Sequence, residues 1–391
     1  MTHGRDGFSL AHRAALMAAK ALRAVAVGAV AAVITSLAVA TNSYAAGPID
    51  PLAVTNANSL LQGSISTFAA GSKKNVKPDT LISGGPLIPG FSATQIPGGI
   101  AVSPATGALY ITNNLSILAA GLLPDFVEGF APNATGASGP IAAIPLVSAA
   151  CDAPATGGAC FPQDVAFVST GGGLGEFYVS QFTGGPASVG NVILYPPDAG
   201  GPTNPLGIPL GIIPDTLTCS AGGSPDTALL LPVGVATDDA GNVYVANAGA
   251  PAGAPAYVTE YPAGVTGCVA PINQVGANTL VQAGFVAVDP AGNIWVSDLA
   301  QNAVFEFSPA GDVLTTIAGK KTQIHSPMGI AISPTGISLG VEDLYVASNR
   351  SGAILLFEDV GSGGLLNIHP VQALKGKKTK LNLPVGVAVM D

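Results

Sequence analysis

Leu-Pro-Val-Gly-Val-Ala-Thr-Asp-Asp-Ala-Gly-Asn-Val-Tyr-Val-Ala-Asn, residues 231–247, predicts two β-strands joined by a tight turn. The first half alternates small and branched apolar residues, which is typical of a half-buried strand. Residues 239–242 supply turn chemistry, because glycine adopts positive φ and Asp and Asn side chains bond to nearby backbone. Residues 243–245 then supply β-branched and aromatic residues, the usual strand formers.

The same pattern returns at residues 97–113, 162–181, 283–298, 327–349 and, cut short by the chain end, 384–391. One alanine marks each copy, and neighbouring markers are separated by 65, 70, 51, 44 and 57 residues. A strand-based repeat of about 40–50 residues is typical of a β-propeller with one four-stranded sheet per blade. We therefore predict an all-β protein with six blades. The markers are Ala101, Ala166, Ala236, Ala287, Ala331 and Ala388.

The two ends of the repeat region complement each other. The last copy holds one strand, at residues 385–389, while residues 52–56 match a second strand. We predict that the ends share one blade, because closure removes the open sheet edges that invite aggregation. Third strands are expected at residues 64–68, 141–144, 192–195, 257–261, 303–307 and 353–357. Outer strands are expected at residues 81–83, 206–212, 271–275, 313–317 and 365–371, with none assigned in the second blade.

The N-terminal segment is predicted to be a targeting signal. Arg13, Lys20 and Arg23 precede an apolar run at residues 24–40, and Ser-Tyr-Ala at residues 43–45 fits a cleavage site. We expect cleavage of residues 1–45, a single propeller domain at residues 46–391, and a secreted or periplasmic location without a stable membrane span. The alternative is an uncleaved anchor, since a run of about 17 residues is the lower limit for spanning a bilayer.

The charge of the mature chain excludes one class of partner. Residues 46–391 retain 10 of the 14 Lys and Arg and 22 of the 23 Asp and Glu, which gives a formal charge of −12. This argues against nucleic acid. Seven of the ten cations nevertheless fall in loops of the fifth and sixth blades. They either steer an anionic ligand or are solvated loop residues. They are Lys320, Lys321, Arg350, Lys375, Lys377, Lys378 and Lys380.

The four cysteines all lie in predicted loops. We predict one disulfide between Cys151 and Cys160 and a second between Cys219 and Cys268, because an even count in an exported chain favours disulfides. Other pairings stay open. Metal–thiolate binding is disfavoured by the absence of a CxxC spacing.

One face of the propeller is the predicted binding face. We call it the top: it carries the connections from second to third strands and from each fourth strand to the next blade. Long insertions fall there, at residues 114–139, 146–161, 214–231 and 248–256. Insertions on one face of a repeat protein usually mark a binding surface, although drift in loop sequence is the alternative. We expect a monomer that binds a protein, a glycan or a small anionic ligand.

Polar residues end the second strands at the top. A ring of such groups is suited to hydrogen-bond a polar ligand or, through Asp298 and the amide of Asn247, a cation such as Ca²⁺ or Mg²⁺. The alternative is that they cap strand ends. Asp164 replaces the glycine of other copies and either projects into the channel mouth or caps a turn. The predicted ligand-binding residues are Asn56, Asn113, Asp164, Gln181, Asn247, Asn349 and Arg350, and Asp298 and Ser348 complete the ring.

One histidine is a candidate catalytic group. His325 precedes the sixth blade at the top, and Asp298 ends a strand in the fifth. A His–Asp pair beside Arg350 is suited to general-base chemistry, since histidine titrates near neutral pH. The alternative is an inert loop histidine. Nucleophile elbows, phosphate loops and paired-histidine zinc motifs are absent from the sequence.

Copies such as residues 232–247 and 284–298 resemble NHL repeats, and the resemblance covers most of residues 50–391. It implies a six-bladed propeller. Relatives of that fold include scaffolds for proteins or glycans, streptogramin B lyase, the peptide-amidating lyase and gluconolactonase-like hydrolases. The amidating lyase implies several metal-binding histidines, for which His325 alone lies on the top face. The hydrolases imply a carboxylate-and-amide metal site, which Asp298 with Asn247 or Asn349 partly supplies. Streptogramin lyase implies a catalytic histidine near Mg²⁺, for which His325 is the candidate.

Two functional hypotheses follow. The first is an exported binding scaffold that uses its looped top face. The second is a metal-dependent lyase or lactonase centred on His325 and Asp298. Fold analogy alone does not decide between them.

Overall fold

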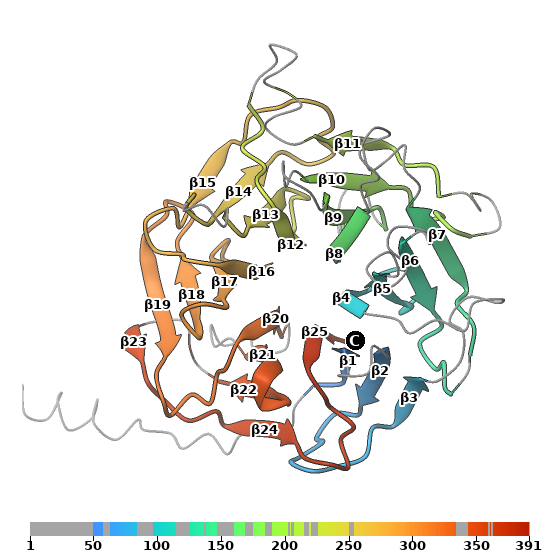
Figure 1. Cartoon of the computed structure of the whole chain (residues 1–391), viewed down its shortest axis with the longest axis vertical. Coiled ribbons are helices and arrows are strands. Elements are labelled where there is room, and N and C mark those ends of the chain that lie inside the picture. The colour runs from blue at the N-terminus through green and yellow to red at the C-terminus, as the bar shows by residue number, and fades with distance from the viewer. Residues whose placement is uncertain are drawn as a thin grey trace, which may run out of the picture. The chain divides into compact units, whose positions relative to one another are not determined.

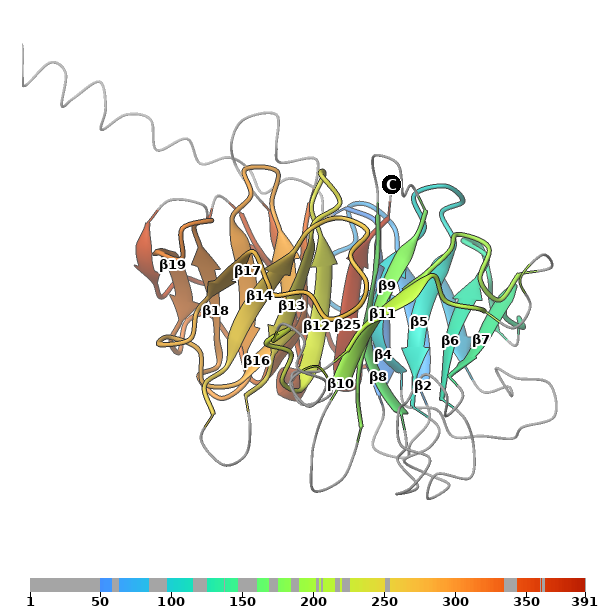
Figure 2. The ribbon, with the colours of Figure 1, turned by 90° about the horizontal axis from the view of Figure 1, so that it is seen from above.

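Each copy of the repeat forms the two inner strands of an antiparallel sheet, and six sheets surround one axis in this computed structural model (Figure 1). Figure 2 shows the innermost strands running along that axis. The predicted all-β, six-bladed propeller is therefore confirmed. The structure describes residues 50–57, 63–83, 97–114, 125–136, 138–146, 160–168, 175–183, 190–201, 204, 207–214, 219, 226–249, 254–333, 343–358, 360 and 363–390.

Blades 1 to 3 contain four strands each, which follow one another from the axis outward. Blade 1 contains β25 (Pro384–Val389), β1 (Leu52–Ala57), β2 (Gly63–Phe68) and β3 (Thr80–Ser83). Blade 2 contains β4 (Pro97–Val102), β5 (Leu109–Asn113), β6 (Asp125–Phe130) and β7 (Ala142–Leu146). Blade 3 contains β8 (Cys160–Phe167), β9 (Phe177–Thr183), β10 (Gly190–Tyr195) and β11 (Gly211–Ile213).

Blades 4 to 6 follow the same order. Blade 4 contains β12 (Pro232–Thr237), β13 (Val243–Asn247), β14 (Tyr257–Tyr261) and β15 (Asn273–Val275). Blade 5 contains β16 (Ala283–Val288), β17 (Ile294–Asp298), β18 (Ala303–Phe307), β19 (Val313–Ala318) and β23 (Gly364–Leu366). Blade 6 contains β20 (Pro327–Ile332), β21 (Leu344–Ser348), β22 (Ala353–Phe357) and β24 (Gln372–Lys375).

The first blade closes the ring. The C-terminal strand β25 pairs with β1, with Ala388 opposite Ala53 and Val387 opposite Val54. The predicted sharing of one blade by the two chain ends is therefore confirmed. Closure leaves neither end of the repeat array with an unpaired inner strand.

The turn chemistry of the repeat explains why the inner strands form. In blade 4 the Asp238 Oδ1 atom accepts hydrogen bonds from the N–H groups of Ala240 and Asn242, at 2.9 and 2.8 Å. Gly241 takes a φ of 83°, which other residues adopt only at a cost. The Tyr244 hydroxyl then donates to Asp238 Oδ2 at 3.2 Å, so the turn and the second strand are tied together.

The hydrophobic core lies between neighbouring blades. Trp295 of blade 5 is fully buried and belongs to the same cluster as Leu344 and Leu355 of blade 6. Near the axis there is less room. A Cβ atom at Gly234 would lie 2.6 Å from the Cα atom of Phe285 in the next inner strand, so glycine is required there.

Blade 2 corrects two predictions. Its third strand is β6, and the predicted third strand at residues 141–144 is wrong because Ala142–Leu146 forms the outer strand β7. The predicted top insertion at residues 114–139 therefore contains a strand. Asp125, Glu128 and Gly129 interrupt the apolar pattern of β6, which is why the sequence did not indicate it.

Blade 6 corrects a third prediction, that of its outer strand. The predicted outer strand at residues 365–371 is wrong, since Gln372–Lys375 pairs with β22. Residues 364–366 instead add a parallel strand to the outer edge of blade 5, where Leu365 lies opposite Thr316. The pairing partner of a short outer strand is set by which sheet edge lies nearby, and a local pattern carries no information about that.

The disulfide between Cys219 and Cys268 is present, with the two Cα atoms 5.6 Å apart. It is typical of proteins that fold in an oxidising compartment. The other predicted pair includes Cys151, which lies outside the described residues, as does the predicted signal peptide. Its partner Cys160 is the first residue of β8, so the prediction that it lies in a loop is wrong. Among the residues described, we find no helix with the length and hydropathy needed to cross a bilayer.

Candidate functional site

The predicted polar ring lies at the top ends of the second strands, but its side chains are buried. In blade 4 the Asn247 Oδ1 atom accepts the N–H of Leu230 at 2.8 Å. In blade 6 the Ser348 Oγ atom accepts the N–H of His325 at 2.9 Å. In each case the donor lies two residues before the inner strand, so these bonds fasten the connection between blades. All six members are buried: Asn56, Asn113, Gln181, Asn247, Asp298 and Ser348.

Two more blades repeat this contact. The N–H of Asn382 donates to Asn56 Oδ1 at 3.3 Å in blade 1, and the N–H of Val281 donates to Asp298 Oδ2 at 2.7 Å in blade 5. In blade 2 the Asn113 amide instead donates to Glu128 Oε2 at 2.9 Å. Strand-end capping therefore accounts for the polarity of Asn56, Asn247, Asp298 and Ser348, and ligand binding by the ring stays a prediction.

Asparagines that follow the ring bridge to the next blade. The side-chain amide of Asn349 donates to the Pro384 carbonyl at 3.1 Å, and that of Asn114 donates to the Pro162 carbonyl at 3.0 Å. Both acceptors are the first or third residue of the next inner strand. These side chains therefore help to hold neighbouring blades together.

The Asp298 carboxylate is fully occupied by its own blade. Oδ1 accepts the N–H of Gln301 at 2.9 Å. Oδ2 accepts the N–H groups of Val281 and Gln282 and the side-chain amide of Gln301, at 2.7, 3.3 and 3.0 Å. Four donors on a side chain with no solvent exposure indicate a structural carboxylate.

The candidate catalytic histidine lies in a different setting. His325 is exposed, and its carbonyl accepts the N–H of Arg350, also exposed, at 3.2 Å. His325 and Asp298 both belong to the described part of the chain, and no hydrogen bond joins their side chains. Within the described ranges no group of three His, Cys, Asp or Glu side chains is placed to hold a metal. The catalytic pair and the divalent cation at Asp298 and Asn247 stay predictions.

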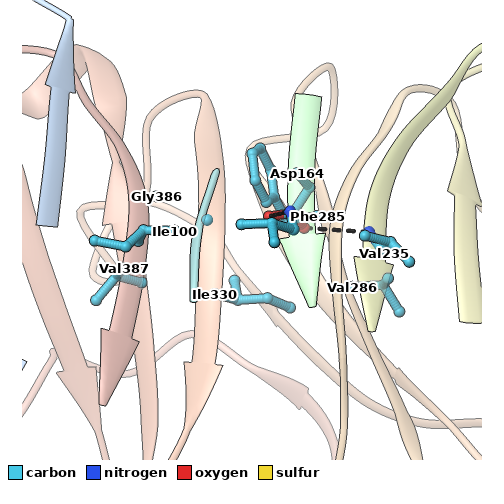
Figure 3. A pocket seen from close by; sticks show the side chains of 10 residues that line it. Ile100, Asp164, Val235, Phe285, Val286, Ile330, Gly386 and Val387 are labelled. Atoms are coloured by element: carbon cyan, nitrogen blue, oxygen red, sulfur yellow. Dashed lines mark hydrogen bonds between the residues drawn. The ribbon is translucent and has the colours of Figure 1, made fainter. Parts of the chain in front are cut away.

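Asp164 lies at the axis of the propeller. Its Oδ1 atom accepts the N–H of Val165 at 2.9 Å, and its Oδ2 atom accepts the N–H of Val235 in the next blade at 3.1 Å (Figure 3). A Cβ atom at Gly99 would lie 1.9 Å from Oδ1, so the carboxyl also contacts the preceding blade. Burial raises the pKa of Asp164 to about 8, and these two hydrogen bonds partly oppose that rise.

The raised pKa of Asp164 predicts that the free energy of unfolding falls as pH rises. The folded pKa of about 8 lies above the value of about 3.9 in an unfolded chain. The native state therefore binds the extra proton, so the contribution of Asp164 to stability is complete below about pH 4 and is lost as pH rises through 8. Glu128, whose pKa burial raises to about 7, acts in the same direction. Urea unfolding between pH 5.5 and 8.5 should show a loss of about 5 kcal/mol from these two groups, of which Asp164 contributes about 3 kcal/mol.

The matched variant is Asp164→Asn, which keeps one oxygen acceptor but does not titrate. We expect it to remove most of this slope. An equal slope in the variant and the unmodified protein would assign the pH dependence to other groups.

A basic sector covers blades 5, 6 and 1. The structure adds three lysines to the seven cations that the sequence placed there, because the segment of residues 69–79 reaches across to β24. The N–H of Lys375 donates to the Lys74 carbonyl at 3.3 Å, and the N–H of Lys378 donates to Asn75 Oδ1 at 2.8 Å. All ten are exposed: Lys73, Lys74, Lys77, Lys320, Lys321, Arg350, Lys375, Lys377, Lys378 and Lys380.

Packing explains this juxtaposition. Val76 packs against a cluster that contains Phe68 of blade 1 and Leu356 and Leu374 of blade 6. Figure 1 shows the segment after β2 lying beside the segment after β24 at the rim. One signal was present in the sequence: the connection at residues 69–79 is long, whereas residues 308–312 suffice for the same connection in blade 5.

No protein-family model and no curated protein matches the sequence. Solved structures match the fold. A protein of unknown function from Bacteroides caccae is 12% identical, with 87% of this chain and 98% of that chain covered and a TM-score of 0.52. A luciferin-regenerating enzyme is 11% identical (78% and 85% covered, TM-score 0.42), and streptogramin B lyase is 11% identical (68% and 69% covered, TM-score 0.36). At these identities the likeness concerns the fold alone and says nothing of activity.

Proposed function

We propose that this protein is an exported binding propeller that recognises an acidic polysaccharide through its basic sector. The observation that carries the proposal is the distribution of charge. Every Lys and Arg of residues 46–391 belongs to the basic sector, although the formal charge of residues 46–391 as a whole is −12. A polyanion is attracted to this sector and repelled by the rest of the surface, so binding is oriented.

The cations of the sector are accessible to a ligand. All ten are exposed, and the Lys375 ammonium donates to the amide oxygen of Gln323 at 2.8 Å rather than to a carboxylate. They come from four separate segments on three blades, which suits an extended polymer better than a small anion. Screening limits each charge to about 8 Å at physiological salt, so several close lysines must act together.

The composition of the sector favours a glycan over a nucleic acid. Nine of its ten cations are lysines, which bind anions as point charges, whereas arginine suits bidentate recognition of phosphate. Its segments at residues 69–79, 319–326, 349–352 and 372–383 contain no Phe, Tyr or Trp on which bases would stack. Carboxylated or sulfated sugars require neither feature.

The test is binding of residues 46–391 to immobilised polygalacturonate and heparin, with neutral dextran as the blank. We expect binding that weakens steeply with salt. The variant Lys320→Gln/Lys377→Gln/Lys378→Gln should raise the Kd at least about tenfold, because each exposed ion pair contributes about 0.5 kcal/mol.

A matched control changes the net charge by the same amount outside the sector. Ala105→Glu/Ala240→Glu/Gln274→Glu alters three exposed positions of blades 2 and 4 and should keep the Kd within about twofold. Equal losses in both variants would mean that net charge, not the sector, governs binding. A protein that binds neither polyanion would overturn the proposal. So would a protein that binds vesicles of anionic lipid but neither polysaccharide.

A further inference from the structure

A cavity of about 80 Å³ lies on the axis of the propeller (Figure 3). Its lining comes from the third and fourth positions of the repeat, counted from the residue that begins each copy, and all six fourth positions contribute. The copies begin at Pro97, Pro162, Pro232, Ala283, Pro327 and Pro384. Most of the lining side chains are apolar, yet the surface that the cavity exposes is almost entirely polar. Backbone groups and the Asp164 carboxyl therefore form its wall. The fourth residues are Ile100, Val165, Val235, Val286, Ile330 and Val387.

The hydrogen-bond pattern shows which backbone groups face the axis. In blade 4 the N–H of Asp238 donates to the Asn242 carbonyl, so that pair is hydrogen-bonded. Hydrogen-bonded and non-hydrogen-bonded pairs alternate in an antiparallel ladder. Counting back along the register, Val235 and Val245 form a non-hydrogen-bonded pair, so the N–H of Val235 points away from β13 and towards the axis.

The alternation of hydrogen-bonded and non-hydrogen-bonded pairs gives the same result in the other five blades. The bonds at the bottom ends of their inner strands are donated by Ser103, Val168, Asp289, Ser333 and Met390. In each blade the fourth residue lies an odd number of pairs away and presents its N–H to the axis. The cavity is lined by third residues but not by the fifth-position alanines, so it lies on the N–H side of the fourth residues.

Asp164 accepts two of these six N–H groups, those of Val165 and Val235. In the blades that carry glycine at the third position there is no equivalent side chain to act as an acceptor. Blade 5 carries Phe285 there, which is apolar. Four N–H groups that converge on the cavity therefore depend on another acceptor.

We propose that the axial cavity binds one small monovalent anion, of the size of a halide, through the N–H groups of Ile100, Val286, Ile330 and Val387. Converging backbone N–H groups form anion-binding concavities in other proteins. The volume has room for one small anion together with water, since a cavity needs only about 10–15 Å³ of probe-occupied volume to hold one water molecule. A polysaccharide does not fit, so this site is independent of the basic sector.

The proton on Asp164 links the site to pH. Asp164 is the one titratable side chain among the ten lining residues, and the flanking strands β4 and β12 present Gly99 and Val235 to it. A charged carboxylate beside the cavity would repel an anion, whereas the neutral acid would not. Because burial raises the pKa of Asp164 to about 8, anion binding strengthens as pH falls from 9 to 6.

The experiment compares residues 46–391 in sodium bromide with the same protein in sodium gluconate, an anion too large for the cavity, at equal ionic strength. At pH 6 and a tenfold excess over Kd, bromide should raise the Tm by about 2 °C relative to gluconate. The difference should shrink at pH 9. In Asp164→Asn it should no longer depend on pH.

A crystal grown in bromide supplies the second measurement and requires no variant. The anomalous signal should show a peak on the axis within hydrogen-bond distance of the backbone nitrogens of Ile330 and Val387. Bromide found on the surface alone, or an axial peak without anomalous signal, would overturn the proposal. Equal Tm values in the two salts would do the same.

Discussion

A chain that ends at residue 383 will fail to form a closed propeller. The deletion removes β25, whose side chains Val385 and Val387 are almost fully buried. It also uncovers Leu52 and Val54, which have no solvent exposure, and leaves β1 with an open edge. Burying an aliphatic side chain contributes about 1.5–3 kcal/mol, so the loss exceeds about 6 kcal/mol. That is comparable with the whole stability of a typical domain, about 5–15 kcal/mol.

Urea unfolding followed by circular dichroism measures this loss, and we expect no cooperative transition in the deletion variant. The control is a chain that ends at Met390, which keeps all of β25 and should unfold with the unmodified midpoint. A synthetic peptide of residues 384–391 should restore part of the transition when added in excess. A deletion variant that unfolds at the unmodified midpoint would contradict the role of β25 in closure.

Replacing Asp298 by alanine will destabilise the protein by about 4 kcal/mol. The reason is that three backbone N–H groups, of Val281, Gln282 and Gln301, lose their acceptor inside the fold. Each unsatisfied buried donor costs about 1–3 kcal/mol. Asp298→Asn keeps one oxygen and should recover about half of the loss.

The control for this prediction is His325→Ala. His325 is exposed, so we expect its replacement to change the free energy of unfolding by less than about 0.5 kcal/mol. Urea unfolding at one pH compares all three variants. An Asp298→Ala variant as stable as the unmodified protein would reject the structural role of the carboxylate and leave the catalytic hypothesis as the better account of it.

The candidate site was only partly visible in the sequence. The type and strand position of Asn247, Asp298 and Ser348 followed from the repeat, but their burial did not. Their oxygens accept N–H groups of a connection that begins 17 to 23 residues earlier in the chain. The uneven distribution of lysines was also visible, whereas the contact of Lys74 with Lys375 joins segments about 300 residues apart.

Local patterns were sufficient for the inner strands, the number of blades and the closure of the ring. Alternating apolar residues and the turn residues between the first and second strands act within one copy, and they recur along the chain. Tertiary structure decided the rest. β6 and β24 carry weak patterns and are placed by the sheet edge beside them. The axial position of Asp164 and the completion of the basic sector arise from contacts between blades, and such contacts exist only once the ring has closed.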